Sequence, residues 1–147
     1  MKLIDSHAHL DNEQFDEDRA EVLERIKENL EFAVNIGYDI ESSRRSVKYA
    51  NENDFIYAVV GVHPIDIEGY SDEVEKELEE LARDKKVLAI GEIGLDYHWM
   101  TQPKEVQQKF FRRQMELARR VGKPVVIHSR DAMEDTLTIL KEFPDVG

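Results

Sequence analysis

The sequence contains no cysteine among its 147 residues. Without thiols the chain forms no disulfide framework, and any metal ion must be held by histidine nitrogens and carboxylate oxygens. No run approaches the roughly eighteen apolar residues that a membrane-spanning helix requires, and Met1–Leu10 lacks the charged start and long apolar middle of a signal peptide. We therefore expect a cytoplasmic protein that makes no contact with membranes.

Positive charge is also scarce. The chain has 20 lysines and arginines against 32 aspartates and glutamates, which gives a net charge of −12. Such a chain does not bind nucleic acid through its overall charge, so acting on DNA or RNA would require metal ions or a local basic patch. We interpret the main basic cluster as a solvated helix face rather than a nucleic-acid site; its members are Lys109, Arg112, Arg113, Arg119, Arg120 and Lys123.

Apolar runs alternate along the chain with acidic segments that have helical apolar spacing. The runs begin at Leu3, Phe32, Ile56, Val87 and Pro124. This alternation indicates a parallel sheet covered by helices, and repeats of about thirty residues are typical of a TIM-type (β/α) barrel. An open doubly wound sheet is the alternative, but the first turn after a strand has no G-x-G-x-x-G.

We therefore predict an α/β fold with about five of the eight βα units of a TIM-type barrel. No linker or low-complexity stretch divides the chain, so residues 1–147 are expected to form a single domain. A sheet of five strands leaves two edges open, and such edges favour self-association.

The stretch LIDSHAHLD places two histidines at the end of the first predicted strand. Successive side chains of a strand point to opposite faces, so Asp5, His7 and His9 share one face. The two imidazoles therefore converge, and Asp5 lies where it could orient one of them.

Three more candidate residues lie at the ends of later strands. His63 ends the third predicted strand, Glu92 lies in the fourth and His128 ends the fifth. Active sites of βα barrels lie at the carboxyl ends of the strands, and nitrogen and oxygen ligands without sulfur suit zinc, manganese or magnesium. The pattern predicts a divalent-metal site that includes these residues.

Other polar and aromatic residues follow the same strand ends. Arg130 could clamp a phosphate, with a helix-cap or salt-bridge role as the alternative. Tyr97, His98 and Trp99 follow Asp96, and such aromatic side chains either stack on bases of a single strand or pack a loop.

Five motifs together resemble one known family. They are LIDSHAHLD, VNIG from Val34, GVHP from Gly61, IGEIGLDY from Ile90 and PVVIHSRDAME from Pro124. In these motifs and their order the chain is similar to the N-terminal part of the TatD family of metal-dependent deoxyribonucleases. The resemblance implies a DNA substrate and a centre with two divalent ions, in which magnesium, manganese or zinc could serve.

The resemblance also implies a role for each candidate residue. His7 and His9 would bind one ion, His128 would bind the other, and Glu92 would be the catalytic carboxylate that bridges them. His63 would lie near the substrate phosphate. Two ions held in this way generate hydroxide from bound water and neutralise charge on phosphoryl oxygens.

The chain also departs from the family pattern. TatD-like chains continue for about three more βα units, which complete the barrel and carry a further histidine and an aspartate. The chain is therefore expected to be C-terminally truncated, to hold each ion with one ligand fewer and to show little nuclease activity. Two alternatives stay open. The first is an amidohydrolase-type metal hydrolase, although Val87–Leu95 lacks the lysine whose carboxylated side chain would bridge the two ions. The second is an inactive half-barrel that only binds metal.

Overall fold

The structure is a computed structural model that describes residues 2–147. Five parallel strands form one sheet in the order β1-β2-β3-β4-β5. The strands are β1 (Leu3–Ala8), β2 (Leu30–Ile36), β3 (Ile56–Val60), β4 (Val87–Asp96) and β5 (Val125–Arg130). The α-helices are α1 (Arg19–Asn29), α2 (Ile40–Glu52), α3 (Asp72–Leu81), α4 (Lys104–Val121) and α5 (Met133–Lys141), and two short 3-10 turns cover Glu13–Phe15 and Ile67–Gly69.

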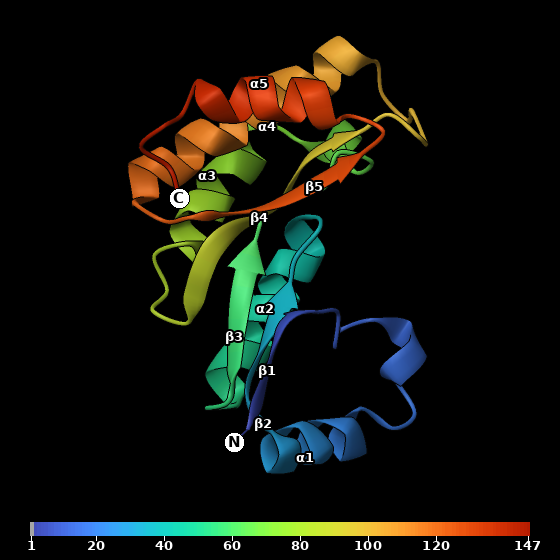
Figure 1. Cartoon of the computed structure of the whole chain (residues 1–147). Coiled ribbons are helices and arrows are strands. Elements are labelled where there is room, and N and C mark those ends of the chain that lie inside the picture. The colour runs from blue at the N-terminus through green and yellow to red at the C-terminus, as the bar shows by residue number, and fades with distance from the viewer. Residues whose placement is uncertain (1) are drawn as a thin grey trace.

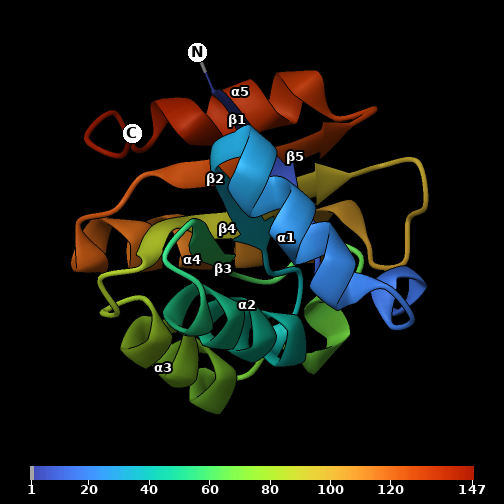
Figure 2. The same ribbon diagram turned by 90° about the horizontal axis from the view of Figure 1, so that it is seen from below.

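The strands follow one another in space in the same order as in the sequence. The sheet curls, and the helices lie along its outer side (Figures 1 and 2). A doubly wound sheet would reverse its strand order at a switch point, and this sheet does not. The predicted architecture of five TIM-type βα units is therefore confirmed. Within residues 2–147, no helix has both the length and the apolar character needed to cross a membrane.

Alternate residues of the strands face two different apolar layers. On β3, Ile56, Ala58 and Val60 pack toward the helices in the larger core, whereas Tyr57 and Val59 belong to a small second cluster on the other face. The period of two in the side chains of a strand explains this division. The edge strand β1 is largely exposed, including Leu3 at 65% and Ile4 at 54%. Self-association through the open edges stays a prediction.

The arginines of α4 contact acidic residues of neighbouring elements. Arg113 bonds to Asp72 at 2.7 Å and to Glu75 at 2.8 Å, and Arg120 also reaches Glu75 at 3.0 Å. Arg112 pairs with Glu142 beyond the end of α5. Carboxylates within the chain therefore neutralise the positive charge of these arginines. Each such exposed ion pair contributes about 1 kcal/mol or less to the free energy of unfolding.

Close backbone approaches shape the carboxyl end of the sheet. Between Ile90 and Ile93, β4 advances three residues while β5 advances two, so β4 carries an extra residue at this point. A methyl group on Gly91 would meet the Val126 Cβ at 2.7 Å, and one on Gly94 would meet the His128 carbonyl oxygen at 2.0 Å. Glycine at these positions lets β4 and β5 lie close together beside Glu92.

Gly94 provides a test of this packing. Its φ of +141° is disfavoured for other residues, and a Cβ there would overlap the backbone of His128. We expect Gly94→Ala to cost about 2 kcal/mol or more and to lower the melting temperature by roughly 4–8 °C. The measurement is thermal unfolding followed by circular dichroism.

Gly69→Ala is the matched control, because a Cβ at Gly69 would meet nothing within 4 Å. We expect this control to change stability by less than about 0.5 kcal/mol. Equal melting temperatures for Gly94→Ala and the unsubstituted chain would show that β4 and β5 can separate at no cost.

Candidate metal centre

Five predicted site residues converge in two groups that share one carboxylate. His7, His9 and Glu92 form one group, and His63, Glu92 and His128 form the other; in each group the possible ligand atoms lie within 4.8 Å of one another. The residues come from β1, β3, β4, β5 and the turns that follow them. The parallel strands bring these distant positions to one end of the sheet.

The histidines of the first strand lie side by side, as their spacing predicts. The ring centroids of His7 and His9 are 5.2 Å apart. The Nδ1 of His9 lies 3.0 Å from the carbonyl oxygen of Ile36, and because a carbonyl only accepts, Nδ1 carries the proton. The Nε2 of His9 then has a free lone pair, which is the form that binds metal.

Asp5 does not orient an imidazole through a side-chain contact. Its Oδ1 instead accepts a hydrogen bond from the backbone amide of His7 at 3.0 Å. Asp5 therefore holds the backbone of β1 at His7, where the register between β1 and β2 shifts, rather than a ring nitrogen.

Glu92 lies between the two groups. One of its oxygens, Oε2, is 3.5 Å from His7 Nε2, and the other, Oε1, is 3.4 Å from His128 Nδ1. Burial opposes the charged form of Glu92, but the hydrogen bond from His128 and the nearby imidazoles outweigh it, so the pKa of Glu92 is lowered. The carboxylate is thus ionised and presents one oxygen to each group.

His128 has a second carboxylate partner, Asp96. His128 Nε2 donates to Asp96 Oδ2 at 2.9 Å, and the Asp96 side chain is almost completely buried. The hydrogen bond with Glu92 raises the pKa of His128 against the effect of burial, and the bond with Asp96 adds to this rise. When neutral, His128 keeps its proton on Nε2 and turns the Nδ1 lone pair toward Glu92, an arrangement typical of a histidine ligand held by a carboxylate.

The contact between Asp96 and His128 was not predicted from the sequence. Burial opposes ionisation of Asp96, but the backbone amide of Trp99, the hydrogen bond from His128 and the amide of His98 together lower its pKa. The G-L-D motif that ends the fourth strand was the available signal, and it does not say which partner the aspartate meets.

His63 has the opposite proton arrangement. Its Nδ1 accepts a hydrogen bond from the backbone amide of Ile65 at 3.2 Å, so the single proton of the neutral ring lies on Nε2. Burial, followed by repulsion from His128, lowers the pKa of His63 to about 4. The ring is therefore neutral near pH 7, and its Nε2–H is a hydrogen-bond donor. The centroids of His63 and His128 are 4.1 Å apart.

This donor set suits divalent ions. The imidazole nitrogens of His7, His9 and His128 and both oxygens of Glu92 are ligands that zinc, manganese and magnesium accept in different proportions. A pocket of about 340 Å³ opens beside them and is lined in part by His9, Tyr38, His63 and Glu92. The centre is therefore accessible from this pocket.

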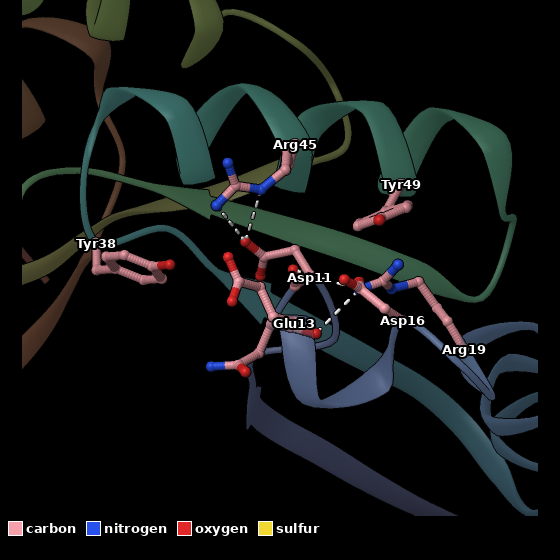
Figure 3. A pocket seen from close by; sticks show the side chains of 8 residues that line it. Asp11, Glu13, Asp16, Arg19, Tyr38, Arg45 and Tyr49 are labelled. Atoms are coloured by element: carbon pink, nitrogen blue, oxygen red, sulfur yellow. Dashed lines mark hydrogen bonds and ion pairs between the residues drawn. The ribbon is translucent and has the colours of Figure 1, made fainter.

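A buried polar network anchors the turn that carries His9. Asn35 on β2 accepts from the backbone amide of Leu10 at 2.6 Å and donates to Asp11 Oδ1 at 3.0 Å and to Ser46 Oγ at 2.7 Å. The Asp11 carboxylate is fully buried and also receives Arg45 (Figure 3). Asn35, Asp11 and Ser46 are all buried. The network therefore connects the carboxyl end of the exposed strand β1 to the interior of the protein.

Asp11 and Arg45 of this network also line a second pocket of about 390 Å³ (Figure 3). This pocket adjoins the first, because Asn12 and Tyr38 line both. Its two arginines are bonded to carboxylates: Arg45 to Asp11 at 3.0 Å and Arg19 to Asp16 at 2.6 Å. The pocket therefore offers little net positive charge to an anion.

Arg130, the remaining predicted site residue, lies outside the two groups. It is exposed at the end of β5, and its guanidinium carbon lies 5.7 Å from the centre of the Trp99 ring. Arg130 is thus on the rim of the site rather than within it.

Comparison with known proteins identifies the family of the chain. Residues 4–147 match the family described as "TatD related DNase". The chain is 48% identical over 141 residues to "Uncharacterized metal-dependent hydrolase YabD" of Bacillus subtilis, a match that covers 95% of this chain and 55% of the relative. It is 37% identical over 137 residues to "3'-5' ssDNA/RNA exonuclease TatD" of a Rahnella species, covering 92% of this chain and 52% of the relative.

Two solved structures have a similar fold. The TatD homologue YJJV of Escherichia coli matches with a TM-score of 0.88 and 32% identity, over 99% of this chain and 58% of that one. An uncharacterised amidohydrolase from Saccharomyces cerevisiae matches with a TM-score of 0.86 at 24% identity, which shows the fold alone. The chain spans about half the length of the curated relatives it matches. On the family match and these relatives, the chain belongs to the TatD-related family of metal-dependent hydrolases.

Proposed function

We propose that this chain supplies the histidine and glutamate ligands of a two-metal centre that hydrolyses phosphodiester bonds in DNA. One observation carries the proposal: the two oxygens of Glu92 face different histidine groups, at 3.5 Å from His7 and 3.4 Å from His128. A carboxylate placed in this way can bridge two ions. The relative named as an ssDNA/RNA exonuclease supports a single-stranded nucleic acid as substrate.

In this proposal His7 and His9 bind one ion, His128 binds the other and Glu92 binds both. When bound, the ions supply Lewis acidity and an activated water. The chain's own groups set the ligand geometry: the Ile36 carbonyl holds the His9 ring, and Asp96 holds the His128 ring. The Ile36 carbonyl keeps a proton on Nδ1 of His9, and Asp96 keeps a proton on Nε2 of His128. In the neutral rings, Nε2 of His9 and Nδ1 of His128 then have the lone pairs that bind the ions.

His63 and Arg130 have different roles in the proposal. His63 donates its Nε2 proton in a hydrogen bond to a phosphoryl oxygen, because its Nδ1 is already the acceptor for Ile65. Arg130 contacts a phosphate at the rim, where its guanidinium is exposed. These donors place positive or partly positive charge beside a polyanion, although the chain as a whole carries −12.

The proposal predicts how manganese binds. We expect isothermal titration calorimetry to detect two Mn²⁺ ions per chain, with modest affinity. A His7→Ala, His9→Ala double variant should lose one of them, or weaken it about tenfold or more, because it removes both imidazole ligands from one side of Glu92.

His98→Ala is the control for this measurement. His98 is exposed and its Nδ1 lies 3.3 Å from Asp131, away from both ligand groups. Manganese binding should be unchanged in this control. A double variant that binds two ions as tightly as the unsubstituted chain would remove His7 and His9 from the centre.

The proposal also predicts the effect of Glu92 on hydrolysis. The chain should be assayed with Mg²⁺ or Mn²⁺ on fluorescent single-stranded DNA. It should also be assayed with about a hundred residues added from the matching Bacillus subtilis relative, enough for a barrel of about 250 residues. We expect slow cleavage by the shorter form and faster, EDTA-sensitive cleavage by the longer one. Glu92→Gln in the longer form should reduce the rate about a hundredfold or more, because it removes the bridging negative charge.

The same assay distinguishes the alternative reaction. If the longer form left DNA intact but hydrolysed an amide or an ester in a metal-dependent manner, the substrate would be a carbonyl compound, as in amidohydrolases. If it hydrolysed neither, while still binding two ions, the chain would be a metal-binding domain only.

A further inference from the structure

Three aromatic side chains follow Asp96 at the end of β4, and the structure gives them different surroundings. The Tyr97 hydroxyl donates to Asp135 Oδ2 at 2.6 Å and accepts from Gln108 at 2.9 Å, and Lys104 Nζ lies 4.4 Å from the ring centre. Tyr97 is therefore fixed between α4 and α5. It packs the loop and is not available to a ligand.

Trp99 has a different environment. It is 62% exposed, which is unusual for the largest apolar side chain of a protein. Arg130 lies 5.7 Å from its ring centre, and the His98 ring meets it edge-on with the centroids 5.0 Å apart. The indole therefore lies at the rim where β4 and β5 end, accompanied by a guanidinium group and open to solvent.

The position of Trp99 is tied to the candidate metal centre by one buried carboxylate. Asp96 Oδ1 accepts from the backbone amides of His98 at 3.0 Å and Trp99 at 2.9 Å, while Asp96 Oδ2 accepts from His128 at 2.9 Å. A single rigid group thus holds both a proposed metal ligand and the backbone of the exposed indole. The indole is therefore held at the rim by the same residue that holds His128.

We propose that Trp99 is a stacking platform for a base of single-stranded nucleic acid, with Arg130 contacting the adjoining phosphate. The inference rests on the proposed function and adds a binding site to it. Stacking suits this chain because it gains little from electrostatic attraction at a net charge of −12. A base presents a neutral aromatic face, and one stacked base contributes about 1–3 kcal/mol.

Two charged residues follow one another at the end of β5, Arg130 and Asp131. The carboxylate of Asp131, the neighbour of Arg130 in sequence, lies 3.3 Å from His98 Nδ1. The Arg130 guanidinium lies 5.7 Å from the centre of the indole, where it can contact both an aromatic face and a phosphate. The site would not distinguish strongly among base sequences, because every base has a π-face.

Trp99 is the only tryptophan of the chain, so its own fluorescence reports the contact. The full chain is titrated in EDTA, which prevents cleavage, with a short oligothymidylate and with an abasic strand of the same length. We expect saturable quenching by the oligothymidylate and little quenching by the abasic strand. Equal quenching by both strands, or none by either, would overturn the stacking proposal.

Variants measure the contribution to affinity, with labelled oligothymidylate followed by fluorescence anisotropy. Trp99→Ala should weaken binding about tenfold and Trp99→Phe less, whereas Arg130→Ala should weaken binding of the base-containing and the abasic strand alike. Met133→Ala is the control, since Met133 is 63% exposed but lies on α5. It should leave the affinity unchanged.

The binding assay is independent of hydrolysis, so the two proposals can fail separately. If Trp99→Ala bound oligothymidylate as tightly as the unsubstituted chain while Glu92→Gln abolished cleavage, the stacking site would be wrong and the proposed function would stand. If Trp99→Ala weakened binding while no form cleaved DNA, the stacking site would stand and the hydrolytic function would fall.

Discussion

The arrangement of the site depends on one ionised carboxylate held among imidazoles from different strands. Glu92 is only partly exposed, and burial by itself would favour its neutral form. Its charge is retained because His7 and His128 lie within 3.5 Å on either side. The extra residue in β4 and the glycines beside it allow the backbone to approach closely enough for this contact.

The four histidines around Glu92 are not equivalent. The carbonyl of Ile36 and the carboxylate of Asp96 accept hydrogen bonds from His9 and His128, so each of these rings, when neutral, keeps a lone pair on its other nitrogen. The amide of Ile65 donates to His63 and leaves that ring with a proton to offer. The backbone and one aspartate thus separate ligand-like imidazoles from a donor-like one, although the side chains are chemically identical.

The acidity of the chain also shapes how it could meet a polyanion. The arginines of α4 are paired with carboxylates of α3 and of the segment after α5, and the two arginines of the second pocket are paired as well. In the proposed function, phosphate is attracted by the bound ions and by Arg130 at the rim. A neutral aromatic surface such as Trp99 complements this arrangement, because stacking requires no net charge.

Periodicity in the sequence was sufficient for the architecture. Apolar runs alternating with helical stripes predicted five βα units, and the pairing of His7 with His9 follows from the two-residue repeat of a strand. The convergence of His63, Glu92 and His128 follows from parallel strands that end at one edge. These features depend on local spacing and on a general property of βα folds, so the sequence alone determined them.

The tertiary structure decided which partner each polar group meets. Asp96 and His128 are 32 residues apart, and Asn35 meets Leu10 across 25 residues. Tyr97 and Trp99 are almost adjacent in sequence, yet one is bonded to Asp135 and the other is exposed. The physical reason is that proton positions and burial depend on contacts between distant elements, which local periodicity does not encode.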